Sequence, residues 1–236
     1  MKRFLSKLFL GNIGELKPPK YNPIQKRIHN IQAIWNNNHQ DDNGVEKLIR
    51  LFLSSSQLMF PGVYIKYWAG KISYRYQDLA LDLYIILKVI SPLVIVINRW
   101  QHQEWLLWTV VYLVLETVLY IPTLIFASDV FSKPRSYKRS MLLIFFNYLE
   151  IAFCFAVFYA HGNYLNMPLQ NWYDAVYFSI ITSSTIGYGD LYPITAMGKF
   201  LVSIQALLFL FFLVLFLNFF STKVKSKGYF DEQNEG

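Results

Sequence analysis

The sequence predicts an all-α membrane protein, with four transmembrane helices per chain and a short re-entrant helix and loop between the last two. The first observation is composition, because 54% of the 236 residues are hydrophobic and only 16% are charged. A typical soluble domain has about 25% charged residues. The second is that the apolar residues gather in runs long enough to cross about 30 Å of hydrocarbon. Much of the surface is therefore expected to face lipid.

Four apolar runs have the length of a membrane-spanning helix, which needs about 20 residues. They are residues 79–98, 104–127, 140–160 and 198–220. A fifth apolar run, 172–184, is too short to cross. At membrane depth such a segment is expected to enter and leave on the same side.

The distribution of basic residues predicts the orientation. Lysine and arginine are frequent in residues 1–78, in the linker 128–139 and in the tail 221–236, whereas residues 161–193 contain neither. Short loops rich in lysine and arginine stay on the cytoplasmic side. Both termini are therefore expected in the cytoplasm and the re-entrant segment outside, in a multi-pass protein of the cell (plasma or inner) membrane.

The N-terminal third is expected to form a cytoplasmic or membrane-surface region. Apolar residues recur at helical spacing in 23–35 and 45–59, which predicts two amphipathic helices. Aromatic and basic residues interleave between 64 and 76, as they do at membrane interfaces. The expected parts are the N-terminal region 1–78, a transmembrane hairpin 79–127, a module of two membrane helices around the re-entrant segment 140–220, and a short cytoplasmic tail 221–236.

The re-entrant run leads directly into a specific hexapeptide. Residues 172–184 are followed by Thr185-Ile186-Gly187-Tyr188-Gly189-Asp190, and the last membrane helix comes soon after. This arrangement resembles the pore helix and signature sequence of the tetrameric potassium channels, over about residues 140–220. The resemblance implies a potassium-selective channel, in which the hexapeptide is the selectivity filter.

The resemblance implies which atoms bind the ion. A dehydrated K⁺ needs oxygen ligands in place of water, and these would be the backbone carbonyls of Thr185, Ile186, Gly187 and Tyr188 with the Thr185 hydroxyl. Carbonyls that all face inward require alternating backbone handedness, and Gly187 and Gly189 can adopt positive φ without a Cβ penalty. The chain carries one filter, so closing rings of oxygen requires a homotetramer. No cofactor is expected besides the permeant K⁺.

Further residues are expected to shape or support the filter. Asp190 would form a carboxylate ring at the outer mouth, where it attracts cations. Thr182, Ser184 and Ile181 would support the filter from behind. Ser184 stands where many family members have threonine, and Ile181 stands where small bacterial potassium channels have an acidic residue that pairs with the aspartate. That carboxylate pair is therefore expected to be missing. Asp174 is expected to serve as a favourable charge at the start of the short helix.

The last membrane helix differs from the family pattern, because residues 200–220 contain no glycine and Phe209 stands near the usual hinge glycine. Leu210, Leu213 and Leu217 share one helical face. They could line an apolar inner cavity or face neighbouring helices, and helical spacing fits both arrangements equally.

Several charged residues fall inside predicted spans, where an unpaired charge is costly. Lys88 and Glu116 lie on neighbouring helices and could form an ion pair. Such a pair could lock the two helices together or take part in sensing. Asp82 and Glu150 are interpreted as lying nearer the span ends, within reach of the interface.

Other functional classes find little support in the sequence. No helix carries a basic residue at every third position, and only two spans precede the 140–220 module, which argues against a four-helix voltage sensor. No catalytic triad, phosphate loop or metal motif points to an enzyme. The net charge of +7 is accounted for by topology and contact with the lipid bilayer, without nucleic acid. A non-conducting membrane scaffold, a subunit of an active potassium transporter and a less selective cation passage remain alternatives.

Overall fold

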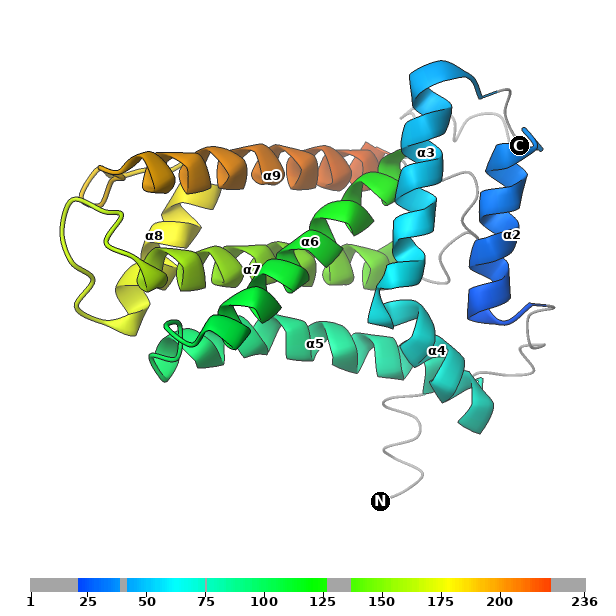
Figure 1. The fold of residues 1–236 in the computed structure, drawn as a ribbon, viewed down its shortest axis with the longest axis horizontal. Coiled ribbons are helices and arrows are strands. Elements are labelled where there is room, and N and C mark those ends of the chain that lie inside the picture. The colour runs from blue at the N-terminus through cyan, green and yellow to red at the C-terminus, as the bar shows by residue number, and fades with distance from the viewer. Residues whose placement is uncertain (1–20, 39–41, 75, 127–136, 222–236) are drawn as a thin grey trace, which may run out of the picture.

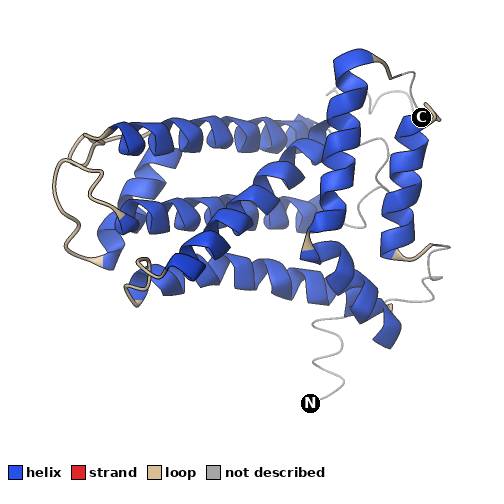
Figure 2. Cartoon of the chain, viewed as in Figure 1, coloured by secondary structure: helices blue, strands red, loops and turns tan. Residues whose placement is uncertain are grey.

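The computed structural model describes residues 21–38, 42–74, 76–126 and 137–221, and these residues form helices and loops without a named strand (Figure 2). Most of the basic linker and nearly all of the tail that were predicted to be cytoplasmic lie outside the described residues, as do residues 1–20.

Within the described residues, four helices are each long and apolar enough to cross a membrane, and the bent pair Gly44–Met59 and Pro61–Ile72 would be a fifth candidate if it formed one span. The four are α5 (Tyr76–Ile97), α6 (Glu104–Phe126), α7 (Tyr137–His161) and α9 (Ala196–Ser221). The short helix α8 (Trp172–Ser183) lies between the last two. The predicted fold class is confirmed, and the predicted limits differ from the observed ones by at most three residues.

The spans run along the long axis of the molecule in alternating directions. Helices α5, α7 and α9 lie roughly along this axis, and α6 crosses them diagonally (Figure 1). Because each span reverses the direction of the last, the links 98–103 and 162–171 lie at the same end as the loop that follows α8. The starts of α5 and α7 lie at the opposite end.

The N-terminal helices lie across this opposite end of the spans (Figure 1). They are α2 (Pro23–Trp35), α3 (Gly44–Ser56), the 3₁₀ turn η1 (Gln57–Met59) and α4 (Pro61–Ile72). Helix α2 begins with a capping box, in which Asn22 Oδ1 accepts the backbone N–H of Gln25 at 2.8 Å. The sequence predicted α4 only as an interfacial segment, because its aromatic and basic residues hide any simple amphipathic pattern.

Helix α3 exposes several large apolar side chains and buries one charged side chain. Leu48 is 68% exposed and Phe52 is 62% exposed. Arg50 is 2% exposed, and its Nη1 lies 2.6 Å from Oδ1 of Asp42. An exposed apolar face of this kind is suited to contact with a membrane or another protein surface.

The core is organised around α7, which contacts α5, α6, α8 and α9. Two clusters of buried apolar side chains meet on this helix. One joins α7 to α8, α9 and α6 through residues such as Phe155, Phe178 and Phe212, and the other joins it to α5 and α6 through Val157, Val96 and Val110. The module predicted at 140–220 is therefore packed directly against the hairpin.

Candidate functional site

Helix α8 is fixed at its start by Asp174. One carboxylate oxygen of Asp174, Oδ2, accepts the backbone N–H groups of Gln170 at 2.8 Å and Asn171 at 2.9 Å. These bonds close the first turn, and a negative charge is favourable at this end of a helix. The other end of α8 therefore carries the partial negative charge of the helix dipole, and it is this end that meets the hexapeptide.

The backbone of the hexapeptide alternates in handedness. Thr185, Gly187 and Gly189 have φ values of 59°, 51° and 82°, whereas Ile186 and Tyr188 between them are not in the positive-φ region. A Cβ on either glycine would meet no atom within 4 Å, so backbone conformation and not space explains the glycines. Positive φ at the β-branched Thr185 is a strained conformation of the kind found at functional sites.

The backbone N–H groups at the start of the hexapeptide are held by the last turn of α8. The N–H of Thr185 donates to the carbonyl of Thr182 at 3.2 Å. The N–H groups of Ile186 and Gly187 both donate to the carbonyl of Ile181, at 3.1 and 3.3 Å. Ile181 thus holds the start of the hexapeptide through its backbone carbonyl, while its side chain lies in the core.

These hydrogen bonds decide where the carbonyls point. In a trans peptide the N–H and the preceding C=O point in opposite directions, and the chain has no cis peptide among the described residues. The carbonyls of Ser184, Thr185 and Ile186 therefore point away from the end of α8. The hydroxyl of Ser184 is turned back toward the helix, where it donates to the carbonyl of Ile180 at 2.8 Å.

Two large side chains of the hexapeptide are exposed in the single chain. Ile186 is 54% exposed and Tyr188 is 71% exposed, although both are large and apolar or aromatic. Side chains of this kind are normally covered when they occur at an ordered site.

Tyr177 on α8 and Asp190 at the end of the hexapeptide influence each other, which the sequence analysis did not anticipate. The interaction with the Asp190 carboxylate is the main cause that raises the pKa of Tyr177. Tyr177 lies one turn before Ile181 on α8, the position at which small bacterial potassium channels have an acidic residue.

Asn166 ties the loop after α7 to the residues at and after the end of the hexapeptide. Its Nδ2 donates to the carbonyl of Asp190 at 3.0 Å, and its Oδ1 accepts the N–H of Tyr192 at 3.0 Å. Nearby, a Cβ on Gly198 would lie 2.9 Å from the carbonyl oxygen of Tyr164, so this glycine permits a close approach of two backbones. In the sequence, Asn166 stands out only as a polar residue in a loop, and Gly198 only as a small residue near the start of a helix.

The leucines predicted for the inner helix share the outward face of α9. Leu210, Leu213 and Leu217 are all exposed in the single chain. Phe212 and Leu215, on the opposite face, are buried. The three leucines do not face the chain's own core, and whether they line a cavity or meet a neighbouring helix stays a prediction.

The charged residues inside the spans form a buried cluster. Lys88 Nζ lies 3.1 Å from Glu116 Oε2 and 3.1 Å from Glu150 Oε1. Thr117 accepts from Lys88 at 3.0 Å and donates to Glu150, and Tyr84 donates to Glu116 at 2.7 Å. The interpretation that Glu150 reaches the interface was wrong, because Glu150 lies midway along α7 and is 0% exposed.

A second ion pair lies near the first residues of α5 and α7. Asp82 Oδ1 on α5 accepts from Arg139 Nη2 on α7 at 2.6 Å, and both side chains are about one-third exposed. Asp82 therefore lies near one end of its span, as expected, and the pair joins α5 to α7.

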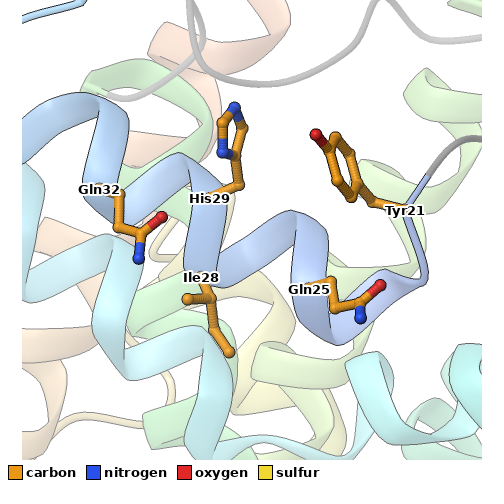
Figure 3. Close-up of a pocket in the computed structure, with 5 residues that line it drawn as sticks. All are labelled: Tyr21, Gln25, Ile28, His29 and Gln32. Carbon is orange, nitrogen blue, oxygen red and sulfur yellow. The ribbon is translucent and has the colours of Figure 1, made fainter.

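Other parts of the described chain offer no comparable site. A surface recess on α2 is lined by Tyr21, Gln25, Ile28, His29 and Gln32, with the rings of Tyr21 and His29 stacked 5.5 Å apart (Figure 3). It lies on the opposite end of the molecule from α8. Within the described ranges, no cluster of three His, Cys, Asp or Glu side chains could hold a metal.

Comparisons with known proteins find a likeness to ion channels over part of this chain. Residues 142–226 match a family described as "Ion channel". A stretch of 73 residues is 36% identical to potassium voltage-gated channel subfamily A member 6 of Mus musculus, and covers 30% of this chain and 14% of that protein. A 73-residue stretch is 37% identical to subfamily A member 4 of Homo sapiens, covering 30% of this chain and 11% of that protein.

The chain spans only a small part of these relatives, and no solved structure gives a significant match. The findings show a resemblance to potassium channels over a segment, in a multi-pass membrane protein. They point to a channel and not to an enzyme.

Proposed function

We propose that four copies of this chain form a potassium-selective channel that conducts K⁺ passively down its electrochemical gradient. The observation that carries this proposal is the backbone of residues 185–189. Its φ angles alternate in sign, and α8 holds its first N–H groups so that the opposing carbonyls point away from the end of α8. A row of carbonyl oxygens with that orientation can replace the water shell of K⁺.

Four copies are proposed because one strand supplies only one oxygen to each ring around the ion. Ile186 and Tyr188 remain exposed in the single chain, which is consistent with cover from neighbouring copies. A closed ring of identical subunits is the usual symmetry of such assemblies. In this arrangement the Asp190 carboxylates form a ring at the outer mouth, and the carbonyls of Thr185, Ile186, Gly187 and Tyr188 bind K⁺.

The proposed topology places the filter outside and both termini in the cytoplasm of the cell membrane. Residues 1–78 then form a membrane-surface region, 79–127 a peripheral hairpin, 140–220 the pore module and 221–236 a cytoplasmic tail. The transverse placement of α3 at one end of the spans supports this arrangement. Its apolar face, which includes Leu48 and Phe52, suits the membrane interface.

We also propose that gating does not use a voltage sensor of the four-helix type, although the matched relatives are named voltage-gated. In α5 and α6, Lys88 is the only basic residue. It is held between two carboxylates, whereas a sensor needs several charges that move across the membrane field.

The proposal is tested with purified full-length protein in lipid vesicles. We expect K⁺ flux down the gradient, and reversal potentials in mixed Na⁺ and K⁺ that follow K⁺. No flux in any condition supports the non-conducting scaffold, uphill accumulation supports an active transporter subunit, and equal permeability supports a less selective cation passage.

A glycine pair supplies the matched control for this experiment. Gly187→Ala should abolish selective flux, because alanine is strained at a φ of 51°. Gly62→Ala should leave flux unchanged, because its Cβ would make an ordinary contact of 3.5 Å with Leu81. Equal effects of the two substitutions would contradict the assigned filter.

A further inference from the structure

The inner helix carries a buried polar side chain that joins three helices. Gln205 on α9 is almost completely buried. Its Oε1 accepts the hydroxyl of Tyr159 on α7 at 2.7 Å. Its Nε2 donates to the carbonyl and the hydroxyl oxygen of Ser179 on α8, at 2.9 and 2.8 Å. The Ser179 hydroxyl in turn donates to the carbonyl of Ala152 on α7 at 2.5 Å.

This Tyr159–Gln205–Ser179 network is neutral and has no missing partner. None of its side-chain nitrogen or oxygen atoms is among the buried unsatisfied atoms of the described residues. A fully satisfied buried network fixes a single arrangement of the helices that contribute to it, because each alternative leaves a polar group unpaired. The carboxamide of Gln205 therefore fixes the spacing of α7, α8 and α9.

The same turn of α8 is connected to the filter. Ser179 lies two residues before Ile181, whose carbonyl accepts the N–H groups of Ile186 and Gly187. A rotation or shift of α8 at Ser179 would move this carbonyl, and the filter backbone with it. The ring of Tyr159 also packs edge-on against Phe178 of α8, with centroids 4.7 Å apart.

We propose that Gln205 and Tyr159 are positioning residues for ion selection. By fixing α8 through Ser179, they set the position of the filter carbonyls, on which discrimination between K⁺ and Na⁺ depends. The inference rests on the proposed function, because it needs a filter that conducts. It adds residues outside the hexapeptide to the set that determines specificity.

The test is Gln205→Met in the full-length chain, reconstituted in vesicles. Methionine has a similar volume and length but cannot form the three hydrogen bonds. We expect K⁺ flux to persist and the Na⁺-to-K⁺ permeability ratio to rise about fivefold, because all three hydrogen bonds of the Gln205 carboxamide are lost. Leu208→Met, at a buried position without such bonds on the same helix, should leave the ratio unchanged. An unchanged ratio in Gln205→Met overturns the proposal.

Tyr159→Phe keeps the test informative if Gln205→Met does not fold. It removes one hydroxyl and should raise the ratio by about twofold, because only one hydrogen bond is lost. A Tyr159→Phe channel with unchanged selectivity also overturns the proposal. Failure of the proposed function looks different, because the unsubstituted protein itself would then show no K⁺-selective flux.

Discussion

Two polar networks are buried along α7, and they differ in charge. The first contains Lys88, Glu116 and Glu150 and joins the α5–α6 hairpin to α7. The second contains Tyr159 and Gln205, is neutral, and joins α7 to α8 and α9. Glu150 and Tyr159 are about 14 Å apart along the helix axis, at 1.5 Å per residue. One helix therefore connects a charged junction to an uncharged one.

The difference concerns buried charge close to the hexapeptide. A fixed charge in a low-dielectric surrounding acts over a long distance, so in the proposed channel a buried charge behind the carbonyls would change the energy of the passing ion. The Tyr159–Gln205–Ser179 network holds α8 without a buried charge, and the carboxylates of Asp174 and Asp190 are not buried. At the hairpin junction, away from the hexapeptide, charge-assisted hydrogen bonds give stronger attachment. The same strength makes the charged junction the more damaging one to break.

The largest effect is expected from Lys88→Met. It leaves Glu116 and Glu150 facing each other without the ammonium group that lies 3.1 Å from each. Removing one partner of a buried ion pair typically lowers the free energy of unfolding by about 3–5 kcal/mol. Denaturation of the purified protein in mixed micelles measures this change.

Two further variants show whether the loss comes from charge. Lys199→Met removes an exposed lysine and should have little effect. The triple variant Lys88→Met/Glu116→Leu/Glu150→Leu should recover much of the lost stability, because apolar side chains of similar volume often replace a buried ion pair without loss. A triple variant as unstable as Lys88→Met alone would show that packing and not charge decides the result.

The neutral network should respond less strongly in the same measurement. Gln205→Met leaves the buried Tyr159 hydroxyl without its acceptor, and the Ser179 carbonyl without its second donor. A buried group left unsatisfied lowers the free energy of unfolding by about 1–3 kcal/mol. A loss larger than that of Lys88→Met would reverse the comparison between the two networks.

The sequence predicted features that depend on runs and on local spacing. Apolar runs located the four spans to within three residues. The hexapeptide anticipated positive φ at Gly187 and Gly189, which the structure shows. Both signals are local, because helix length and glycine conformation do not depend on which helices meet in the fold.

The buried networks could not be predicted in the same way. Gln205 and Ser179 are polar residues in largely apolar helices, and sequence spacing does not show which faces of α7, α8 and α9 meet. Glu150 was assigned to the interface although it lies in the middle of its helix, because the third helix was not known to pack against Lys88. Which polar residues become buried and paired depends on tertiary contacts between segments that are distant in the sequence.

A smaller free-energy change is expected for the coupling between Tyr159→Phe and Gln205→Met. Residues in direct contact have non-additive effects on stability. The double variant should therefore be more stable than the sum of the two single changes predicts, by about 1 kcal/mol. The four unfolding curves of this double-mutant cycle measure the coupling. Additive losses would show that the 2.7 Å bond between the two side chains contributes no stability.

The smallest effect is expected from Glu150→Gln, although it alters a charge that is 0% exposed. Lys88 faces two carboxylates, so replacing one by an amide leaves one positive and one negative charge. The amide oxygen of glutamine can still accept from Lys88 and Thr117. We expect the free energy of unfolding to change by no more than about 1 kcal/mol, the range of a substitution that keeps its hydrogen bonds. If Glu150→Gln instead destabilises the protein as much as Lys88→Met, both carboxylates are needed to hold the lysine, and charge balance alone does not explain the junction.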